Sequence, residues 1–250
     1  MKRIILCEGK TDAILISYFL QQFNWSYTKK PVINLPVDKN NEVLNWYIHR
    51  EKPNQELAIW GVGGLEQIPI KLGQVIQRTR REINPINRFS RLVIFFDSDT
   101  RNDTECLKLI EDWVAESSLI LVSDLQIGKW LEATTEMTFK TPPESYPVSL
   151  LAIVLPPASQ GNLEIFLLDC LHKHSNEYRQ LVEEARQFID HLSNQPYLEK
   201  QRLRDKAQLG AVLSVMSPDW VFSELDQRLT LIPWEELQLV YNVYKKLESL

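Results

Sequence analysis

Short, almost continuous apolar runs are the feature of this sequence that most constrains its fold. They cover residues 3–7, 57–60, 92–96 and 150–155, and stretches with helical spacing separate the first three. Strands with one face in water alternate apolar and polar residues, whereas continuous runs are typical of parallel strands covered by helices on both faces. The sequence therefore predicts an α/β fold with a mostly parallel sheet flanked by helices.

Apolar residues at every third or fourth position predict the intervening helices. We expect helices over residues 12–23, 41–51 and 65–83, with Thr11 or Asp12 capping the first, and a further strand over residues 32–35. Residues 119–122 fit either a strand or the end of a helix. Residues 141–147 contain three prolines and are expected to form a loop.

The chain after Gly161 carries helical spacing and no strand signal. Helices are expected over residues 163–172, 177–192, 198–216 and 234–250, and Pro196, Pro218 and Pro233 separate them. Proline interrupts helices because it lacks a backbone N–H group. We therefore predict an α/β domain of residues 1–158 and a helical C-terminal region of residues 159–250 packed on it.

The charge balance excludes one class of nucleic-acid-binding protein. The chain has 28 Lys and Arg against 33 Asp and Glu, a net charge of -5. Proteins that coat nucleic acid non-specifically depend on many Lys and Arg contacts to phosphates, which this balance does not supply. A nuclease is compatible with it, because the carboxylates of a metal site lower the net charge.

Composition also indicates the compartment. Three scattered cysteines are too few for a disulfide framework. No apolar run approaches the roughly 18 residues of a membrane span, and the apolar start of the chain ends at Glu8, too early for a signal peptide. We expect a cytoplasmic protein without membrane contact.

Carboxylates follow two of the predicted strands. Glu8 comes directly after residues 3–7, and Asp97 and Asp99 come directly after residues 92–96. Ligands of open parallel sheets bind beyond the carboxyl ends of the strands, and Mg²⁺ prefers carboxylate oxygens. An Asp after a strand is often only a turn residue. Matching acids at two strand ends favour a metal site.

These residues resemble the signatures of the Toprim domain. Its motifs are a Glu-Gly after the first strand and an Asp-x-Asp after a later one, matched here by Glu8-Gly9 and by Asp97-Ser98-Asp99. The domain is shared by topoisomerases, bacterial primases, OLD-type nucleases, recombination-repair proteins and a ribosomal-RNA maturation ribonuclease. The resemblance covers about residues 1–155, with a wider gap between the motifs than in compact members. It implies a Toprim-like, Rossmann-like sheet that binds Mg²⁺ or Mn²⁺.

The resemblance also implies roles for single residues. Glu8 would be a general acid/base or metal ligand, and Asp97 and Asp99 would hold the metal. Asp12 would join them, as a second acidic residue does in OLD-like members, or would cap a helix. Glu164 lies in a Gly-x-Leu-Glu element that in these relatives completes the metal site. Its alternative role is a carboxylate stabilised by the helix dipole.

Two lysines and a group of arginines are candidates for contact with phosphate. Lys206 resembles a late lysine that stabilises phosphate charge in OLD-like nucleases, or belongs to a solvated basic helix face. Lys10 lies next to Glu8 in the predicted cleft. The densest basic run comprises Arg78, Arg80, Arg81, Arg88 and Arg91. It could contact a nucleic-acid backbone or form the exposed end of a helix.

The leading functional hypothesis is a Mg²⁺- or Mn²⁺-dependent protein that cleaves phosphodiester bonds of DNA or RNA, similar to small single-Toprim relatives of OLD nucleases. The alternatives are a non-catalytic Toprim-like module that binds nucleic acid or a protein partner, and a phosphate-ester enzyme acting on small molecules. OLD enzymes carry an ATPase motif that this sequence lacks, since Lys10-Thr11 has no Walker glycines before it. This departure puts an OLD-type role in question but not the chemistry. Besides DNA or RNA, the possible partners are a separate ATPase and a second copy of the chain.

Overall fold

The computed structural model describes residues 2–29, 35–37, 42–140, 142–192, 195–220 and 223–250. The described chain divides into two units. The first comprises residues 2–96, 101–154 and 245–250, and the second comprises residues 97–100 and 155–244. No helix within the described ranges is long and apolar enough to cross a membrane.

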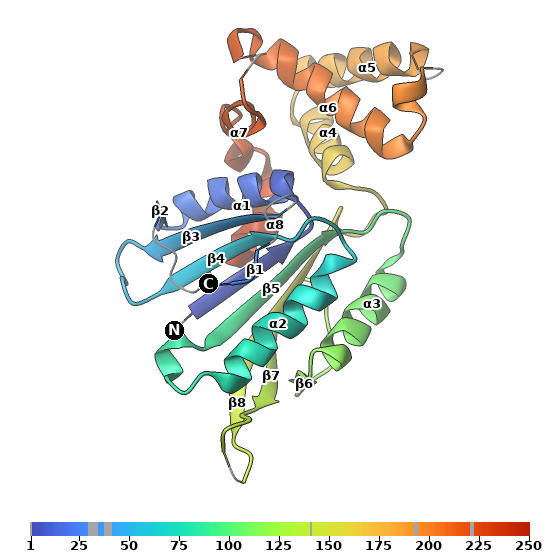
Figure 1. Ribbon diagram of the computed structural model, residues 1–250. Coiled ribbons are helices and arrows are strands. Elements are labelled where there is room, and N and C mark those ends of the chain that lie inside the picture. The colour runs from blue at the N-terminus through green and yellow to red at the C-terminus, as the bar shows by residue number, and fades with distance from the viewer. Residues whose placement is uncertain (1, 30–34, 38–41, 141, 193–194, 221–222) are drawn as a thin grey trace. The chain divides into compact units, whose positions relative to one another are not determined.

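A mixed sheet forms the centre of the first unit (Figure 1). Within the described residues the strand order is β2-β3-β4-β1-β5-β8-β7-β6. The strands are β1 (Lys2–Cys7), β2 (Trp25–Thr28), β3 (Val43–His49), β4 (Glu56–Gly61), β5 (Phe89–Asp97), β6 (Ile120–Leu121), β7 (Trp130–Glu136) and β8 (Ser145–Leu155).

The parallel part of the sheet lies at β1, where Ile5 pairs with Ile59 of β4 on one side and with Val93 of β5 on the other. The pairs β2–β3, β3–β4, β6–β7 and β7–β8 are antiparallel. The expected strands over residues 3–7, 57–60, 92–96 and 150–155 are confirmed as β1, β4, β5 and β8. The fold is α/β, as predicted, and its sheet is mixed.

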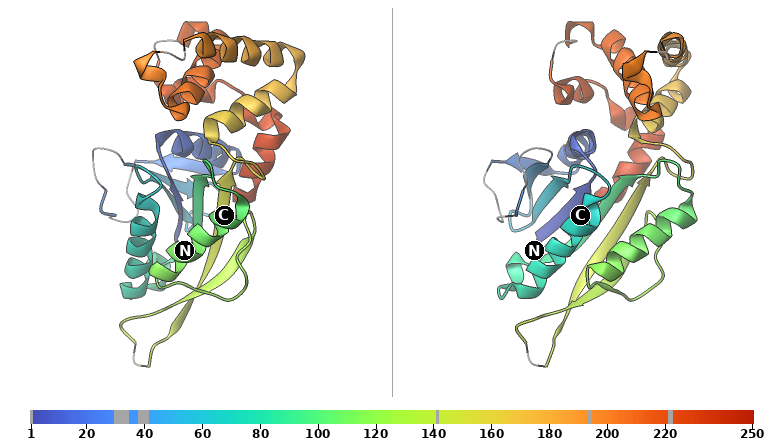
Figure 2. Two further views of the ribbon diagram at one scale, coloured as in Figure 1. Left: turned by 90° about the vertical axis from the view of Figure 1, so that its right-hand side faces the viewer. Right: turned by 45° about the vertical axis from the view of Figure 1, so that its right-hand side comes forward.

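Helices cover both faces of this sheet (Figure 2). They are α1 (Lys10–Gln22), α2 (Gln67–Arg81) and α3 (Asp103–Glu116). The helices α2 and α3 bury apolar side chains against β1, β4 and β5, where Ile4 and Leu6 join one core with Ile76 and Ile110. Burial of strand residues from both sides explains why these strands are continuous apolar runs.

Three expectations for the first unit were wrong in part or fall outside the described residues. Residues 41–51 were expected to be a helix, but they contain β3, whose run of Trp46, Tyr47 and Ile48 favours a strand. Residues 145–147 belong to β8 rather than to a loop, and Pro147 lies opposite Thr134 of β7. Of the expected strand over residues 32–35, residues 32–34 lie outside the described part of the chain.

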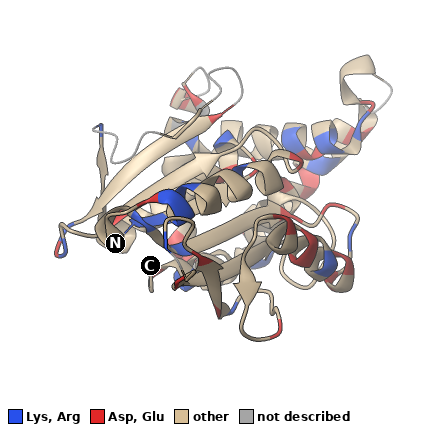
Figure 3. Cartoon of the chain, turned by 60° about the horizontal axis from the view of Figure 1, so that its bottom comes forward, with Lys and Arg blue, Asp and Glu red and all other residues tan. Residues whose placement is uncertain are grey.

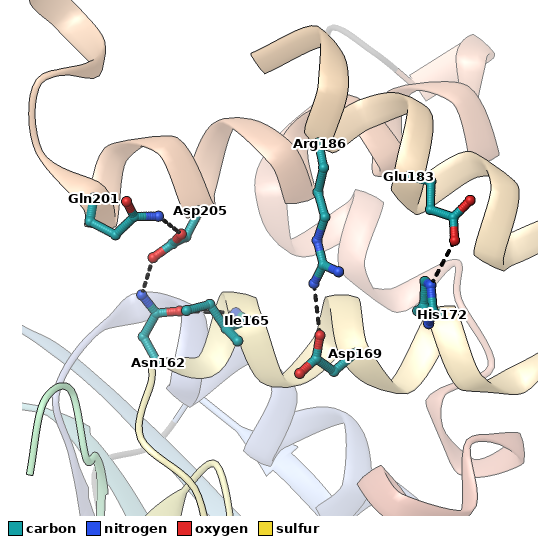
Figure 4. Close-up of polar contacts among 8 residues, drawn as sticks. All are labelled: Asn162, Ile165, Asp169, His172, Glu183, Arg186, Gln201 and Asp205. Atoms are coloured by element: carbon teal, nitrogen blue, oxygen red, sulfur yellow. Dashed lines mark hydrogen bonds and ion pairs between the residues drawn. The ribbon is translucent and has the colours of Figure 1, made fainter. Parts of the chain in front are cut away.

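The second unit is helical. Its helices are α4 (Leu163–His174), α5 (Asn176–His191), α6 (Gln201–Met216), α7 (Leu225–Thr230) and α8 (Gln238–Tyr244). The helices α4, α5 and α6 contact one another. Asp169 of α4 accepts a hydrogen bond from Arg186 of α5 at 2.7 Å, and His172 lies 3.1 Å from Glu183 (Figure 4).

The end of the chain departs from the single expected helix over residues 234–250. The regular helix α8 is confined to Gln238–Tyr244, and short 3-10 turns precede and follow it. Residues 245–250 belong to the first unit, where Ser249 accepts a hydrogen bond from Trp130 of β7 at 2.8 Å. The backbone oxygen of Ser249 also accepts a hydrogen bond from Arg91 of β5.

Candidate metal and phosphate site

Glu8 lies directly after β1, in a turn fixed by backbone hydrogen bonds. The N–H group of Gly63 donates to the Glu8 oxygen at 2.9 Å, and the N–H group of Val62 donates to the Cys7 oxygen at 2.9 Å. The end of β4 approaches this turn closely, because a Cβ atom on Gly61 would lie 2.9 Å from the Gly9 oxygen. Glycine at position 61 is therefore required for the turn that presents Glu8.

Asp12 lies in the first turn of α1. The N-cap residue is Gly9, and its N–H group donates to Asp12 Oδ2 at 2.9 Å. Asp12 therefore caps the start of α1 with its side chain, as expected, although the N-cap residue itself is Gly9 rather than Thr11 or Asp12. Asp12 is 6% exposed. A carboxylate at this position is also stabilised by the helix dipole.

The pKa of the Cys7 thiol is affected by the carboxylates of both Glu8 and Asp12. Burial raises the pKa of Cys7 well above its ordinary value, and the negative charges of Asp12 and Glu8 raise that pKa further. Both acids thus act on one atom at the end of β1. The other cysteines are also buried, and burial raises the pKa of Cys170 to about 12.

We expect none of the three thiols of the native chain to react rapidly with an aromatic disulfide reagent at pH 8. The thiolate is the reacting species, and a thiol with a pKa near 12 is ionised only to about one part in ten thousand at that pH. The absorbance of the released product measures the reaction. Three equivalents should react in denaturant, and rapid labelling of Cys7 in the native chain would contradict the burial described here.

Asp97 is the last residue of β5, and it belongs with Asp99 to the second unit. Ser98, between them, is 2% exposed, and its N–H group donates to the Leu155 oxygen at 2.6 Å. The N–H group of Asp99 donates to the Gly161 oxygen at 2.7 Å, and Gly161 donates in turn to Ser98 Oγ at 3.1 Å. These bonds fix the segment against residues 155–161.

The backbone of Asp99 has a left-handed conformation, with φ of 51°. This conformation is uncommon for residues other than glycine, although Asp and Asn adopt it more readily than most. Asp99 is exposed, whereas Oδ1 of Asp97 is buried. The two acids, separated by Ser98, therefore differ in their exposure to solvent.

Glu164 lies in the first turn of α4 and is 7% exposed. Asn162 caps this helix, because its Oδ1 accepts a hydrogen bond from the Ile165 N–H group at 2.9 Å. The ammonium of Lys206, on α6, lies 3.4 Å from Glu164 Oε1. The structure therefore brings together two residues that the sequence suggested separately and that lie about 40 positions apart.

Asp205, the residue before Lys206, was missed by sequence reasoning. It is 3% exposed and accepts hydrogen bonds from Asn162 at 2.7 Å and from Gln201 at 2.8 Å (Figure 4). Its neighbours in sequence are charged, and such a run is typical of a solvated helix face. The pattern gave no signal that one member is buried.

Three arginines of the basic run make contacts within the protein. Arg80 donates to the Glu136 oxygen at 2.9 Å, Arg88 donates to the Glu82 oxygen at 2.8 Å, and Arg91 donates to Ser249. Figure 3 shows all Lys and Arg of the described chain in blue. Arg78, Arg80 and Arg81 lie in the last turn of α2. Two of them, Arg78 and Arg81, line a pocket of about 350 Å³ together with Leu35, Pro36, Gln74, Gln77 and Glu82.

Lys10, the last predicted phosphate contact, is exposed at the first residue of α1. Among the described residues, no group of three or more His, Cys, Asp or Glu side chains is placed to hold a metal ion, so the predicted ligands are not gathered into one metal-binding group. The candidate ligands of the second unit are Asp97, Asp99 and Glu164, which offer only carboxylate oxygens. By its chemistry this donor set fits a hard cation such as Mg²⁺ or Mn²⁺.

Comparison with known proteins gives one match. A family model described as "Protein of unknown function (DUF3226)" matches residues 2–219. No curated protein and no solved structure is significantly similar to the chain.

Proposed function

We propose that this chain, which belongs to the DUF3226 family, is a Mg²⁺- or Mn²⁺-dependent protein that cleaves phosphodiester bonds of DNA or RNA. The family description names no activity, so the proposal rests on the residues of the chain itself. Its likeness to the Toprim domain is part of the proposal. That likeness is supported by the positions of Glu8-Gly9 directly after β1 and of Asp97 at the end of β5.

One observation carries the proposal. The segment with Asp97 and Asp99 is hydrogen-bonded through Ser98 and Asp99 to Gly161, three residues before Glu164. Two distant parts of the sequence that carry candidate carboxylates are therefore hydrogen-bonded to each other through backbone groups and the Ser98 hydroxyl, within the second unit. A divalent cation would draw these carboxylates together, because its charge offsets their mutual repulsion.

The chain's own residues would divide the work as follows. Asp97, Asp99 and Glu164 would bind the cation, which would neutralise the scissile phosphate and lower the pKa of an attacking water. Lys206, already held beside Glu164 at 3.4 Å, would donate hydrogen bonds to a phosphate oxygen.

Glu8 would transfer a proton to or from the reacting oxygens. Cys7 is paired with Phe95 in the parallel register, so β1 and β5 end at the same edge of the sheet, and Glu8 is the first residue after β1. Asp12 would support Glu8 from the first turn of α1. Lys10, exposed at the start of that helix, would contact the substrate backbone.

We expect the purified chain to cleave at least one of single-stranded DNA, double-stranded DNA and RNA when Mg²⁺ or Mn²⁺ is present, and to lose this activity in EDTA. Gel electrophoresis of end-labelled substrates measures cleavage. Glu8→Gln should lower the rate while retaining Mn²⁺ binding in calorimetry, since it removes the proton-transfer group and leaves the proposed ligands Asp97, Asp99 and Glu164 unchanged.

The assay separates the alternatives. Cleavage that survives both EDTA and Glu8→Gln would contradict the proposed mechanism. Binding of nucleic acid and Mn²⁺ without cleavage of any substrate would support a non-catalytic module. Hydrolysis confined to a small phosphodiester would indicate an enzyme acting on small molecules.

A further inference from the structure

Asp205 is a nearly fully buried carboxylate in the second unit, 3% exposed. Burial of an ionisable side chain is costly unless hydrogen bonds compensate for the lost water. Here both oxygens are compensated: Oδ2 accepts from Asn162 Nδ2 at 2.7 Å, and Oδ1 accepts from Gln201 Nε2 at 2.8 Å (Figure 4). Gln201 lies one turn earlier on α6, so the carboxylate is oriented by its own helix.

The bond from Asn162 determines how its amide group is oriented. The amide has one accepting oxygen and one donating nitrogen. The amide nitrogen of Asn162 points to Asp205. Its amide oxygen therefore points to the Ile165 N–H group, from which it accepts a hydrogen bond at 2.9 Å. The opposite orientation would place the amide oxygen against a carboxylate and the NH₂ group against an N–H donor. Asp205 therefore selects the capping orientation of Asn162.

Asn162 lies in the short segment between Gly161, which is hydrogen-bonded to the segment of Asp97 and Asp99, and the candidate ligand Glu164. Its predecessor Gly161 is bonded to Asp99 and Ser98, and Glu164 follows two residues later in the first turn of α4. We propose that Asp205 is a positioning residue that acts through Asn162 to hold Glu164 in register with Asp97 and Asp99. It contacts neither metal nor substrate, and this inference rests on the proposed function.

Asp205→Ala is expected to weaken Mn²⁺ binding at least about tenfold, because loss of an outer-shell partner of a metal ligand changes affinity about 10–100-fold. Isothermal calorimetry on the full-length chain measures the dissociation constant. Asn162→Ser should cause a similar loss, since serine still caps the helix but offers no NH₂ group to Asp205. The double variant should be no weaker than the worse single one, because both changes cut the same connection.

Asp169→Ala is the matched control. It also removes a polar contact between α4 and a neighbouring helix, the 2.7 Å bond from Arg186, but five residues beyond Glu164. Its dissociation constant for Mn²⁺ should stay within about twofold of the wild-type value. Asp205→Asn should restore most of the affinity, because its amide oxygen still accepts from Asn162 and the exposed Gln201 can rotate.

The outcomes separate this inference from the proposed function. Unchanged Mn²⁺ affinity in folded Asp205→Ala overturns the positioning role and leaves the metal site intact. If Asp205→Ala does not fold, unchanged affinity in Asn162→Ser has the same meaning. An equal loss in Asp169→Ala also overturns it, since any disturbance of α4 would then suffice. A wild-type chain that binds no Mn²⁺ overturns the proposed function and the inference together.

Discussion

Asp97→Asn is expected to abolish Mg²⁺-dependent cleavage, lowering the rate constant at least about a hundredfold, with a matching loss of Mn²⁺ affinity. Asparagine keeps the size of the side chain and one oxygen but removes its negative charge, which a hard divalent cation requires. Even residues that only support a metal ligand change affinity about 10–100-fold, so a direct ligand should cost more. Single-turnover cleavage and calorimetry measure the two effects.

A matched control for Asp97→Asn is Asp103→Asn. Asp103 is exposed at the first residue of α3, six residues after Asp97, and lies outside the candidate ligand set. Its variant should cleave at the wild-type rate. Asp99→Asn should behave like Asp97→Asn while retaining the fold, because asparagine tolerates the left-handed backbone that Asp99 adopts. Full activity in both Asp97→Asn and Asp99→Asn would rule out these carboxylates as metal ligands.

The strands around β1 could be predicted because burial on both faces requires a recognisable pattern of residues in the sequence. A strand covered by helices on both faces needs apolar side chains at consecutive positions, as in β5, where residues 92–96 are all buried. The strand β3 carries no such pattern. Residues 43–49 form its seven positions, of which only Trp46 and Tyr47 are buried, and their mixed pattern also fits a helix.

Prolines misled the prediction at the start of β8. A cluster of prolines at positions 142, 143 and 147 indicates a loop, because proline cannot donate a hydrogen bond to a neighbouring strand. Pro147 is nevertheless paired with Thr134 in the antiparallel register of β7 and β8. Pairing with β7 determines the conformation of residues 145–147. Buried and more exposed residues alternate along β7, and this pattern does not reveal in the sequence which segment pairs with it.

The candidate site could be predicted only where its chemistry is local. Glu8 and Asp97 stand out because each is an acid that directly follows a continuous apolar run. The ion pair of Glu164 with Lys206 depends on how α4 meets α6, and helical periodicity within each segment does not specify which turns meet. Asp205 was hidden for the same reason. Its carboxylate accepts a hydrogen bond from Asn162, some 40 residues earlier in the chain.

The second large effect is expected for stability, at a buried ion pair in the first unit. Lys71 of α2 lies 2.6 Å from Glu42, and their side chains are only 8% and 5% exposed. Glu42 also accepts a hydrogen bond from Trp60 at 2.7 Å, and the Lys71 ammonium lies 4.8 Å from the centre of the Trp60 ring. The three side chains form one buried group, in which the charges of Lys71 and Glu42 compensate each other.

Lys71→Met is therefore expected to lower the free energy of unfolding by about 3–5 kcal/mol, because it leaves the Glu42 carboxylate buried without its counter-ion. The double variant Lys71→Met with Glu42→Gln should recover much of that loss, since the glutamine still accepts from Trp60 and no charge is left unpaired. Urea unfolding followed by tryptophan fluorescence measures both. Lys140→Met is the control, because its pair with Glu144 is 50% and 58% exposed, and no measurable change is expected. Equal stability of Lys71→Met and the wild-type chain, or a double variant no better than the single one, would show that burial of the Glu42 charge does not govern the stability of this unit.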